Sequence, residues 1–148
     1  MAHTIWSEAD RQALLNRFGR LSPEARPKWG SFDAPRMVTH VTDSIRASLG
    51  ELKLTPFPGP LQYWPINVLV MFYLPWPKST PTAPELLERK PVHWASELEA
   101  LASAVNQFAA RDVNGAWTPH VAFGALTGEQ WGRLNYRHLD HHLGQFGV

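Results

Sequence analysis

Residues 127–146, TGEQWGRLNYRHLDHHLGQF, predict one helix whose apolar stripe continues as a run of histidines. Thr127 and Gln130 stand at the spacing of a capping box, which satisfies free N–H groups at a helix N-terminus. Side chains that recur every three, four or seven residues share one helix face. Here that face carries Trp131, Leu134, His138 and Gln145.

His138 and His142 are the pair on which the predicted function rests. They are four residues apart, so their side chains leave the helix one turn, about 6 Å, from each other. Two imidazoles at this spacing can share one metal ion. His141 is also a helical neighbour of His138, so spacing alone does not choose between His141 and His142. We expect the pair to bind a metal ion together with a third ligand from another helix.

Two interpretations without a metal ion compete with this one. The histidines could form a solvated polar helix end, but Arg133, Arg137 and Asp140 already fill the positions that should face water. They could instead form a hydrogen-bonded network in the core. Metal binding is favoured because neutral imidazole is the commonest protein ligand for first-row metals. Three nitrogen donors also leave coordination positions open, as catalytic sites do.

The composition bounds the class of protein. With 148 residues, 44% of them hydrophobic, the chain is expected to form a single domain, residues 1–148, with a real core. A net charge of +1 and the lack of a basic run argue against a nucleic-acid surface. The longest apolar run, Ile66–Leu74, is far shorter than the roughly 20 residues that span a bilayer. The N-terminus turns polar too soon for a signal peptide, so we expect a cytoplasmic protein without membrane contact.

Three more long helices are predicted upstream of the histidine-rich one. Ser7 and Asp33 are suitable N-caps, and Gly50 suits a C-terminal cap. His40 lies beside the apolar stripe of the second helix and can turn inward, where Asp43 could hold its ring N–H. The predicted helices run from Ser7 to about Arg20, from Asp33 to about Gly50, and from about Pro91 to Arg111.

Residues 51–90 are the least regular part of the chain, with prolines that interrupt any long helix. Pro65–Leu74 is a short apolar segment for which a helix is preferred to a strand. The aromatic residues between Trp64 and Trp76 could roof a pocket or simply cover the core. His120, in a proline-containing loop near the last helix, is expected to be structural, with a role in the pocket as the alternative.

Several motifs are similar to those of one known family. The last helix carries H-x-x-H-H-x-x-Q from His138 to Gln145, the signature that closes the DinB-like (DNA-damage-inducible) family. The segment MVTHVTD around His40 resembles that family's first histidine-bearing helix. Three other segments, which extend the resemblance over most of the chain, are similar to one branch of the superfamily, a domain of unknown function: PWPK (75–78), PTAPE (81–85) and HVAFGALT (120–127).

Four predicted helices with short or wrapped connections already favour an all-α four-helix bundle, with a Pro/Trp-rich excursion between the second and third main helices. The resemblance implies the same bundle, with up-down-down-up connectivity. It also implies a divalent metal ion, with zinc, nickel, iron and manganese as candidates. Carried over to this sequence, the metal ligands are His40, His138 and His142. His141 then becomes a neighbour of the site, and Gln145 a supporting polar residue.

The same resemblance implies an enzyme, because relatives include thiol S-transferases that join a low-molecular-weight thiol to a small electrophilic substrate. A metal ion would lower the pKa of the thiol, which fits a chain without cysteine. A metal-dependent hydrolase would instead need a carboxylate base, for which Asp43 is the only candidate. The other class of function is a non-catalytic stress-response or small-molecule-binding bundle with a structural or vestigial metal site. No catalytic residue is assigned, and a homodimer is compatible with such bundles.

Overall fold

The chain folds almost entirely into helices and loops. The computed structural model describes residues 2–78 and 80–148, and within them it contains five α-helices and no β-strand. None of these helices is long and apolar enough to cross a membrane. The expected all-α class is confirmed. The helices are α1 (Glu8–Gly19), α2 (Ala34–Ser48), α3 (Ile66–Val68), α4 (Trp94–Ala109) and α5 (Gly128–Gln145).

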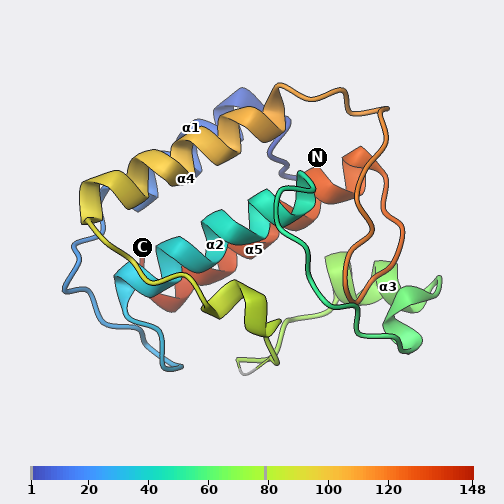
Figure 1. Ribbon diagram of the computed structural model, residues 1–148, viewed down its shortest axis with the longest axis horizontal. Helices are drawn as coiled ribbons and strands as arrows, with labels where there is room; N and C mark the ends of the chain where they lie inside the picture. The colour runs from blue at the N-terminus through green and yellow to red at the C-terminus, as the bar shows by residue number, and fades with distance from the viewer. Residues whose placement is uncertain (1, 79) are drawn as a thin grey trace.

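The four long helices form two layers (Figure 1). One layer consists of α1 and α4, and the other consists of α2 and α5. Across the layers, α2 packs on α4 and α1 packs on α5. Because α2 and α5 are neighbours, the side chains that they turn toward each other can meet.

Side-chain caps fix where the helices begin. Ser7 and Asp33 each accept the backbone N–H three residues further on, at 3.2 and 2.8 Å, and so start α1 and α2. Thr127 and Gln130 form the capping box that starts α5, as the sequence predicts. α4 begins at Trp94, later than predicted, because the residue before it has an extended backbone (φ −141°).

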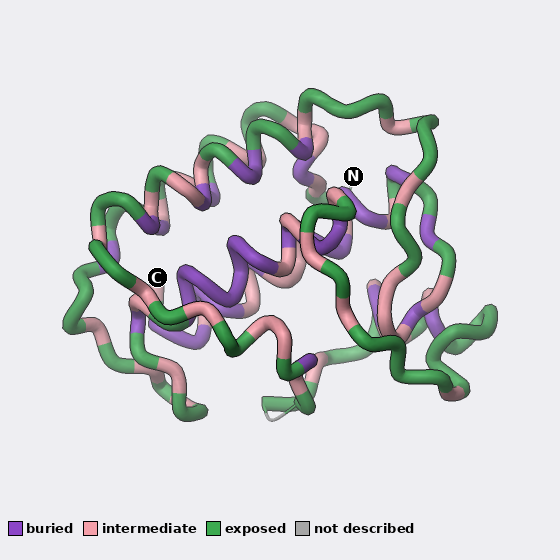
Figure 2. The backbone as a smooth tube through the Cα atoms, viewed as in Figure 1, coloured by how far each residue is buried: buried purple, intermediate pink, exposed green. Residues whose placement is uncertain are grey.

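The apolar core lies between the layers, and α2 is the most deeply buried helix (Figure 2). Each long helix contributes at least one large side chain that is almost fully buried. Burying such a side chain contributes about 1.5–3 kcal/mol to stability. The core therefore holds α2 and α5 in one fixed relation. Examples are Phe18 of α1, Met37 of α2, Phe108 of α4 and Leu143 of α5.

The excursion between α2 and α4 contains only short helical pieces, and Arg137 of α5 anchors it. The guanidinium donates to the carbonyl groups of Val70, Met71 and Leu74 at the end of the central piece. Trp64 is 79% exposed, so this half of the predicted aromatic roof does not form. The pieces are η1 (Pro60–Gln62), α3, the π-helical η2 (Leu69–Tyr73) and η3 (Pro84–Leu87).

Candidate metal centre

Three histidines from two helices meet between α2 and α5. Nε2 of His138 lies 3.1 Å from Nε2 of His40 and 3.1 Å from Nε2 of His142. His40 comes from α2, and the other two come from successive turns of α5. His40 and His142 are buried, whereas His138 is partly exposed. The structure thus brings together the three histidines that were expected to bind a metal ion, with one ligand atom from each within 4.8 Å of the others.

The spacing of the three nitrogens fits a shared metal ion. A first-row metal binds an imidazole nitrogen at about 2.0–2.1 Å, so two such ligands stand about 2.9 Å apart at a right angle and about 3.3 Å apart at the tetrahedral angle. The observed separations of 3.1 Å lie within this range. The three histidines can therefore hold a metal ion.

The amide of Gln145 fixes the position of the proton on His142. Its Nε2 donates to the backbone carbonyl of Trp29 (2.8 Å), so its Oε1 faces Nδ1 of His142 (2.8 Å). Because an amide oxygen only accepts, Nδ1 of His142 carries the proton, and Nε2 of the neutral ring carries a lone pair. That lone pair is on the nitrogen that faces His138. A hydrogen bond to the other ring nitrogen is the usual support of a metal-binding imidazole.

A hydrogen-bonded trio without a metal ion satisfies these nitrogens poorly. Nε2 of His138 has either one proton or one lone pair, yet it faces two other ring nitrogens at 3.1 Å. Without a cation, the two contacts must share one proton, or two lone pairs must face each other. A cation removes this conflict because it accepts a lone pair from each ring.

Burial keeps the three rings neutral. It lowers the pKa of His40 from 6.5 to about 3, aided by repulsion from His142. It also lowers the pKa of His142 to about 4, against the opposing effect of the bond to Gln145, and it lowers the pKa of His138 well below its ordinary value. Neutral imidazole is the form that binds metals, so at neutral pH each of the three rings keeps one nitrogen with a free lone pair.

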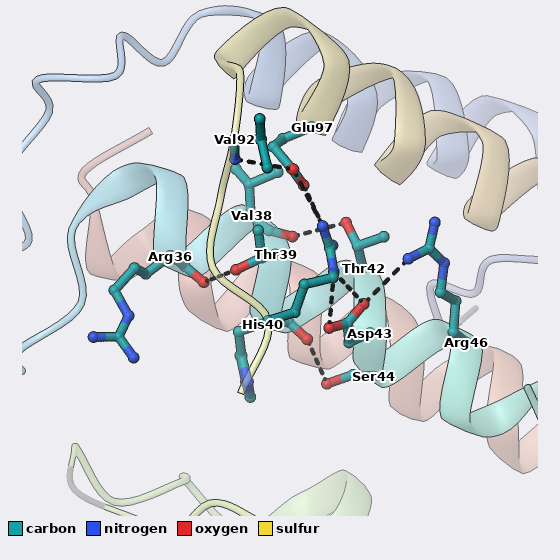
Figure 3. A network of polar contacts seen from close by, with 11 residues as sticks. Arg36, Val38, Thr39, His40, Thr42, Asp43, Ser44, Arg46, Val92 and Glu97 are labelled. Atoms are coloured by element: carbon teal, nitrogen blue, oxygen red, sulfur yellow. Dashed lines mark hydrogen bonds and ion pairs between the residues drawn. The ribbon is translucent and has the colours of Figure 1, made fainter. Parts of the chain in front are cut away.

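The carboxylate of Asp43 does not support His40, contrary to expectation. Nε of Arg89 bonds both oxygens of Asp43 at 3.1 Å, and Nη1 of Arg89 bonds Glu97 of α4 at 2.8 Å. Arg46 adds a contact of 3.3 Å to Asp43. Figure 3 shows the Asp43 carboxylate and the His40 ring leaving α2 in different directions. Nδ1 of His40 is buried and has no hydrogen-bond partner among the described residues.

Aromatic side chains pack against the three histidines. Phe32, from the loop before α2, lies against the rings of His40 and His142, with centroids 5.1 and 5.8 Å away. Trp76, from the excursion, lies 6.3 Å from His138. These residues place apolar surface beside the site. The role of Phe32 was not predicted from the sequence. In a proline-rich loop, no sequence pattern distinguishes an aromatic residue beside a site from one that covers the core.

The other two histidines considered for the site stand outside the trio. His141 lies between Trp29 and Trp76, with ring centroids 6.0 and 5.6 Å away. The structure thus places His142, rather than His141, against His138. His120 has a structural role, since its Nδ1 accepts the backbone N–H groups of residues 122 and 123 at 3.0 and 3.1 Å.

Comparisons with known proteins give one match. A search of curated proteins and a search of solved structures find none. A scan against protein-family models matches residues 8–147 to the family described as "Protein of unknown function (DUF1569)". Because this match spans most of the chain and includes all three clustered histidines, the chain belongs to the DUF1569 family.

Proposed function

We propose that this protein is a DinB-like four-helix bundle that binds one divalent metal ion, zinc, nickel, iron or manganese, and acts as a thiol S-transferase. The two layers of long helices support the bundle. The long excursion between α2 and α4 supports the up-down-down-up connectivity, because only a long connection lets two consecutive helices run parallel. The proposed metal ligands are His40, His138 and His142.

One observation carries this proposal. The Nε2 atoms of His40 and His142 each lie 3.1 Å from Nε2 of His138, and Gln145 holds the proton of His142 on Nδ1, the other ring nitrogen. A purely structural histidine is expected to direct its ring nitrogens at backbone groups, as His120 does. Three imidazole donors also leave coordination positions open for a substrate.

Thiol transfer is proposed because of the chemistry of a metal ion at such a site and because the chain has no cysteine. A bound divalent metal ion supplies a position where a thiol loses its proton near neutral pH. The chain has no cysteine, so the thiol must come from a low-molecular-weight cosubstrate. His138 is the partly exposed member of the trio, so we expect the cosubstrate to approach there, beside the apolar rings of Phe32 and Trp76.

Metal-dependent hydrolysis has weaker support, because the nearby carboxylates are engaged elsewhere. Asp43 is bound by Arg89, and Asp140 of α5 is paired with Arg17 at 2.6 Å. None of the described carboxylates forms a hydrogen bond with the three histidines. A general base for water is therefore missing from the immediate surroundings.

Metal analysis of the protein, purified without a histidine tag, tests the site. We expect close to one equivalent of zinc, nickel, iron or manganese. His138→Ala and His142→Ala should lose the metal while the helical circular-dichroism signal persists. His93→Ala is the matched control, since His93 is exposed at the start of α4 and should keep the metal. Full metal content in the His138→Ala and His142→Ala variants would refute the site.

Turnover of a small electrophile such as 1-chloro-2,4-dinitrobenzene, with and without a low-molecular-weight thiol, tests the reaction. We expect thiol-dependent turnover that a chelator abolishes and added metal restores. Turnover that is unchanged by metal removal would contradict the mechanism. Metal binding without thiol-dependent turnover of any electrophile would favour the non-catalytic binding bundle instead.

A further inference from the structure

A band of aromatic and cationic side chains lies beside the three histidines, and we call it the cationic band. His141 is at its centre, between the indoles of Trp29 (6.0 Å) and Trp76 (5.6 Å). Nζ of Lys78 lies over the ring of Trp29 at 5.2 Å, and the guanidinium of Arg137 lies over the ring of Trp76 at 4.6 Å. Each cation therefore rests on an aromatic face, where the ring quadrupole attracts it.

The cationic band adjoins the metal-binding histidines. Trp76 lies 6.3 Å from His138, and the ring of His141 lies 5.4 Å from that of His142. Trp29, Trp76 and His141 are partly exposed, like His138 itself. A ligand bound at the three histidines would therefore lie close to Trp76 and His141 of the band.

The two cations of the band form no ion pair with a carboxylate among the described residues. Arg137 directs N–H groups of both Nη atoms at carbonyl groups of the excursion, and these neutral acceptors do not cancel its charge. Asp140, one turn of α5 away from Arg137, is paired with Arg17 instead. Two uncompensated cations beside one site attract an anion.

We propose that the cationic band binds a carboxylate group of the substrate or cosubstrate, and that the carbon skeleton of this ligand packs on the indoles. Lys78 makes the main ionic contact, because its ammonium group is exposed on a flexible side chain. Arg137 adds positive charge from a fixed position. The inference rests on the proposed function and names its substrate class, with the carboxylate carried by either the thiol or the electrophile.

Binding to the metal-free protein tests the band separately from the metal site. Benzoate is the probe, and benzamide is its neutral analogue. Binding is followed through the indole N–H signals of Trp29 and Trp76 in two-dimensional NMR spectra, assigned with Trp→Phe variants. Benzoate should shift both signals, bind about fivefold more tightly than benzamide, and weaken as ionic strength rises. Equal binding of the two probes would overturn the proposal.

Two lysine variants locate the ionic contact. Lys78→Gln should weaken benzoate binding about fivefold, and Lys78→Arg should retain it. Lys53→Gln is the control, because Lys53 is also exposed but lies outside the band. Arg137 is not substituted, since it also anchors the excursion. Unchanged benzoate affinity in Lys78→Gln would refute the assignment.

Kinetics of the metal-loaded protein identify which reactant carries the carboxylate. The thiols are mercaptosuccinate and 2-mercaptoethanol, and the electrophiles are a carboxylated nitrohaloarene and its uncharged parent. A rise in KM in Lys78→Gln only for mercaptosuccinate assigns the group to the thiol, and a rise only for the carboxylated electrophile assigns it to the electrophile. No change for either would overturn the role of the band. The benzoate result needs no metal and metal analysis needs no carboxylate, so the two failures can be told apart.

Discussion

Gln145 allows a direct test of the proposed metal site, because its single amide sets the position of the proton on His142. It is 5% exposed, and its two hydrogen bonds, to Nδ1 of His142 and to the carbonyl of Trp29, are both 2.8 Å long. Gln145→Leu keeps a similar volume, but it leaves Nδ1 of the buried His142 without an acceptor and the carbonyl of Trp29 without this donor. Metal affinity should fall about 10–100-fold. The metal-free protein should also lose about 2 kcal/mol of unfolding free energy, the cost of leaving buried polar groups unsatisfied.

Gln145→Glu separates the effect of residue 145 on metal affinity from its effect on the stability of the fold. A carboxylate still accepts the proton of His142 Nδ1, but it cannot donate to the carbonyl of Trp29. Metal affinity should therefore equal or exceed that of the wild type, because a carboxylate makes the imidazole more basic. Stability without metal should still fall.

Substitution of Gly30 perturbs the Gln145 amide without changing Gln145 itself. Its φ is +82°, and a Cβ at this position would lie 2.7 Å from Nε2 of Gln145. Gly30→Ala should displace the amide and lower metal affinity, in addition to a backbone strain of about 1 kcal/mol. Gly50→Ala is the matched control: its φ is +80°, and its Cβ would meet Thr118 rather than Gln145.

Competition with a chromophoric chelator measures the zinc affinity of these variants, and ¹⁵N chemical shifts of His142 report its tautomer in the metal-free protein. The Leu variant and Gly30→Ala should bind zinc weakly, whereas the Glu variant and Gly50→Ala should bind it well. Wild-type affinity in Gln145→Leu, or an equal loss in Gln145→Glu, would show that the amide does not orient the ligand.

Three further predictions concern stability. Histidines of the unfolded chain bind protons near pH 6.5, whereas burial lowers the pKa of His120 in the folded protein to about 4. The contribution of His120 to stability is therefore complete above pH 6.5 and is lost as the pH drops toward 4. The free energy of unfolding falls by up to about 1.4 kcal/mol per pH unit for each such histidine. Urea unfolding of the metal-free protein from pH 7 to 5 measures this slope, and an unaltered slope in His120→Asn would contradict the assignment. Arg89→Met should cost about 3 kcal/mol of unfolding free energy, because the two carboxylates that it bridges stay buried; neutralising both as amides should restore part of the loss, and a full-stability single variant would contradict the bridge. Gly132→Ala should lower the melting temperature strongly, since its Cβ would lie 2.3 Å from Trp6, whereas Gly144→Ala meets nothing within 4 Å and should add about 0.5–1 kcal/mol.

Local signals in the sequence predict the helices and most of the candidate ligand set. The caps at Asp33 and Thr127 act within three residues of themselves, so they can be recognised without knowledge of the fold. The choice of His142 over His141, in contrast, depends on contacts between residues that are far apart in the sequence. It requires the direction of α5 relative to α2 and the contact of Gln145 with a loop carbonyl far away in the chain. The residues alone left both pairs open, and only the resemblance to a family named His142.

Long-range contacts account for what the sequence did not predict. Asp43 was expected to support His40 because the two are three residues apart. Instead Arg89, 46 residues away from Asp43, binds its carboxylate. Trp64 was grouped with Trp76 as a roof by composition alone. Trp76 is fixed near the site because Arg137 stacks on it, whereas Trp64 is 79% exposed. A proline-rich segment carries no periodicity from which such differences could be read.

α2 contributes to two polar clusters, the three histidines through His40 and the ion pairs of Arg89 through Asp43. These clusters have complementary electrostatic roles. Arginines hold the carboxylates of Asp43 and Glu97 in ion pairs, so the histidines have no anionic neighbour bonded to them. Three neutral imidazoles leave the full charge of a bound divalent ion uncompensated, and all-nitrogen donors suit zinc, nickel or iron better than magnesium or calcium. The cationic band adds positive charge beside the histidines. Both features favour anionic ligands, so we expect a thiolate or a carboxylate to bind at this site more tightly than its neutral analogue.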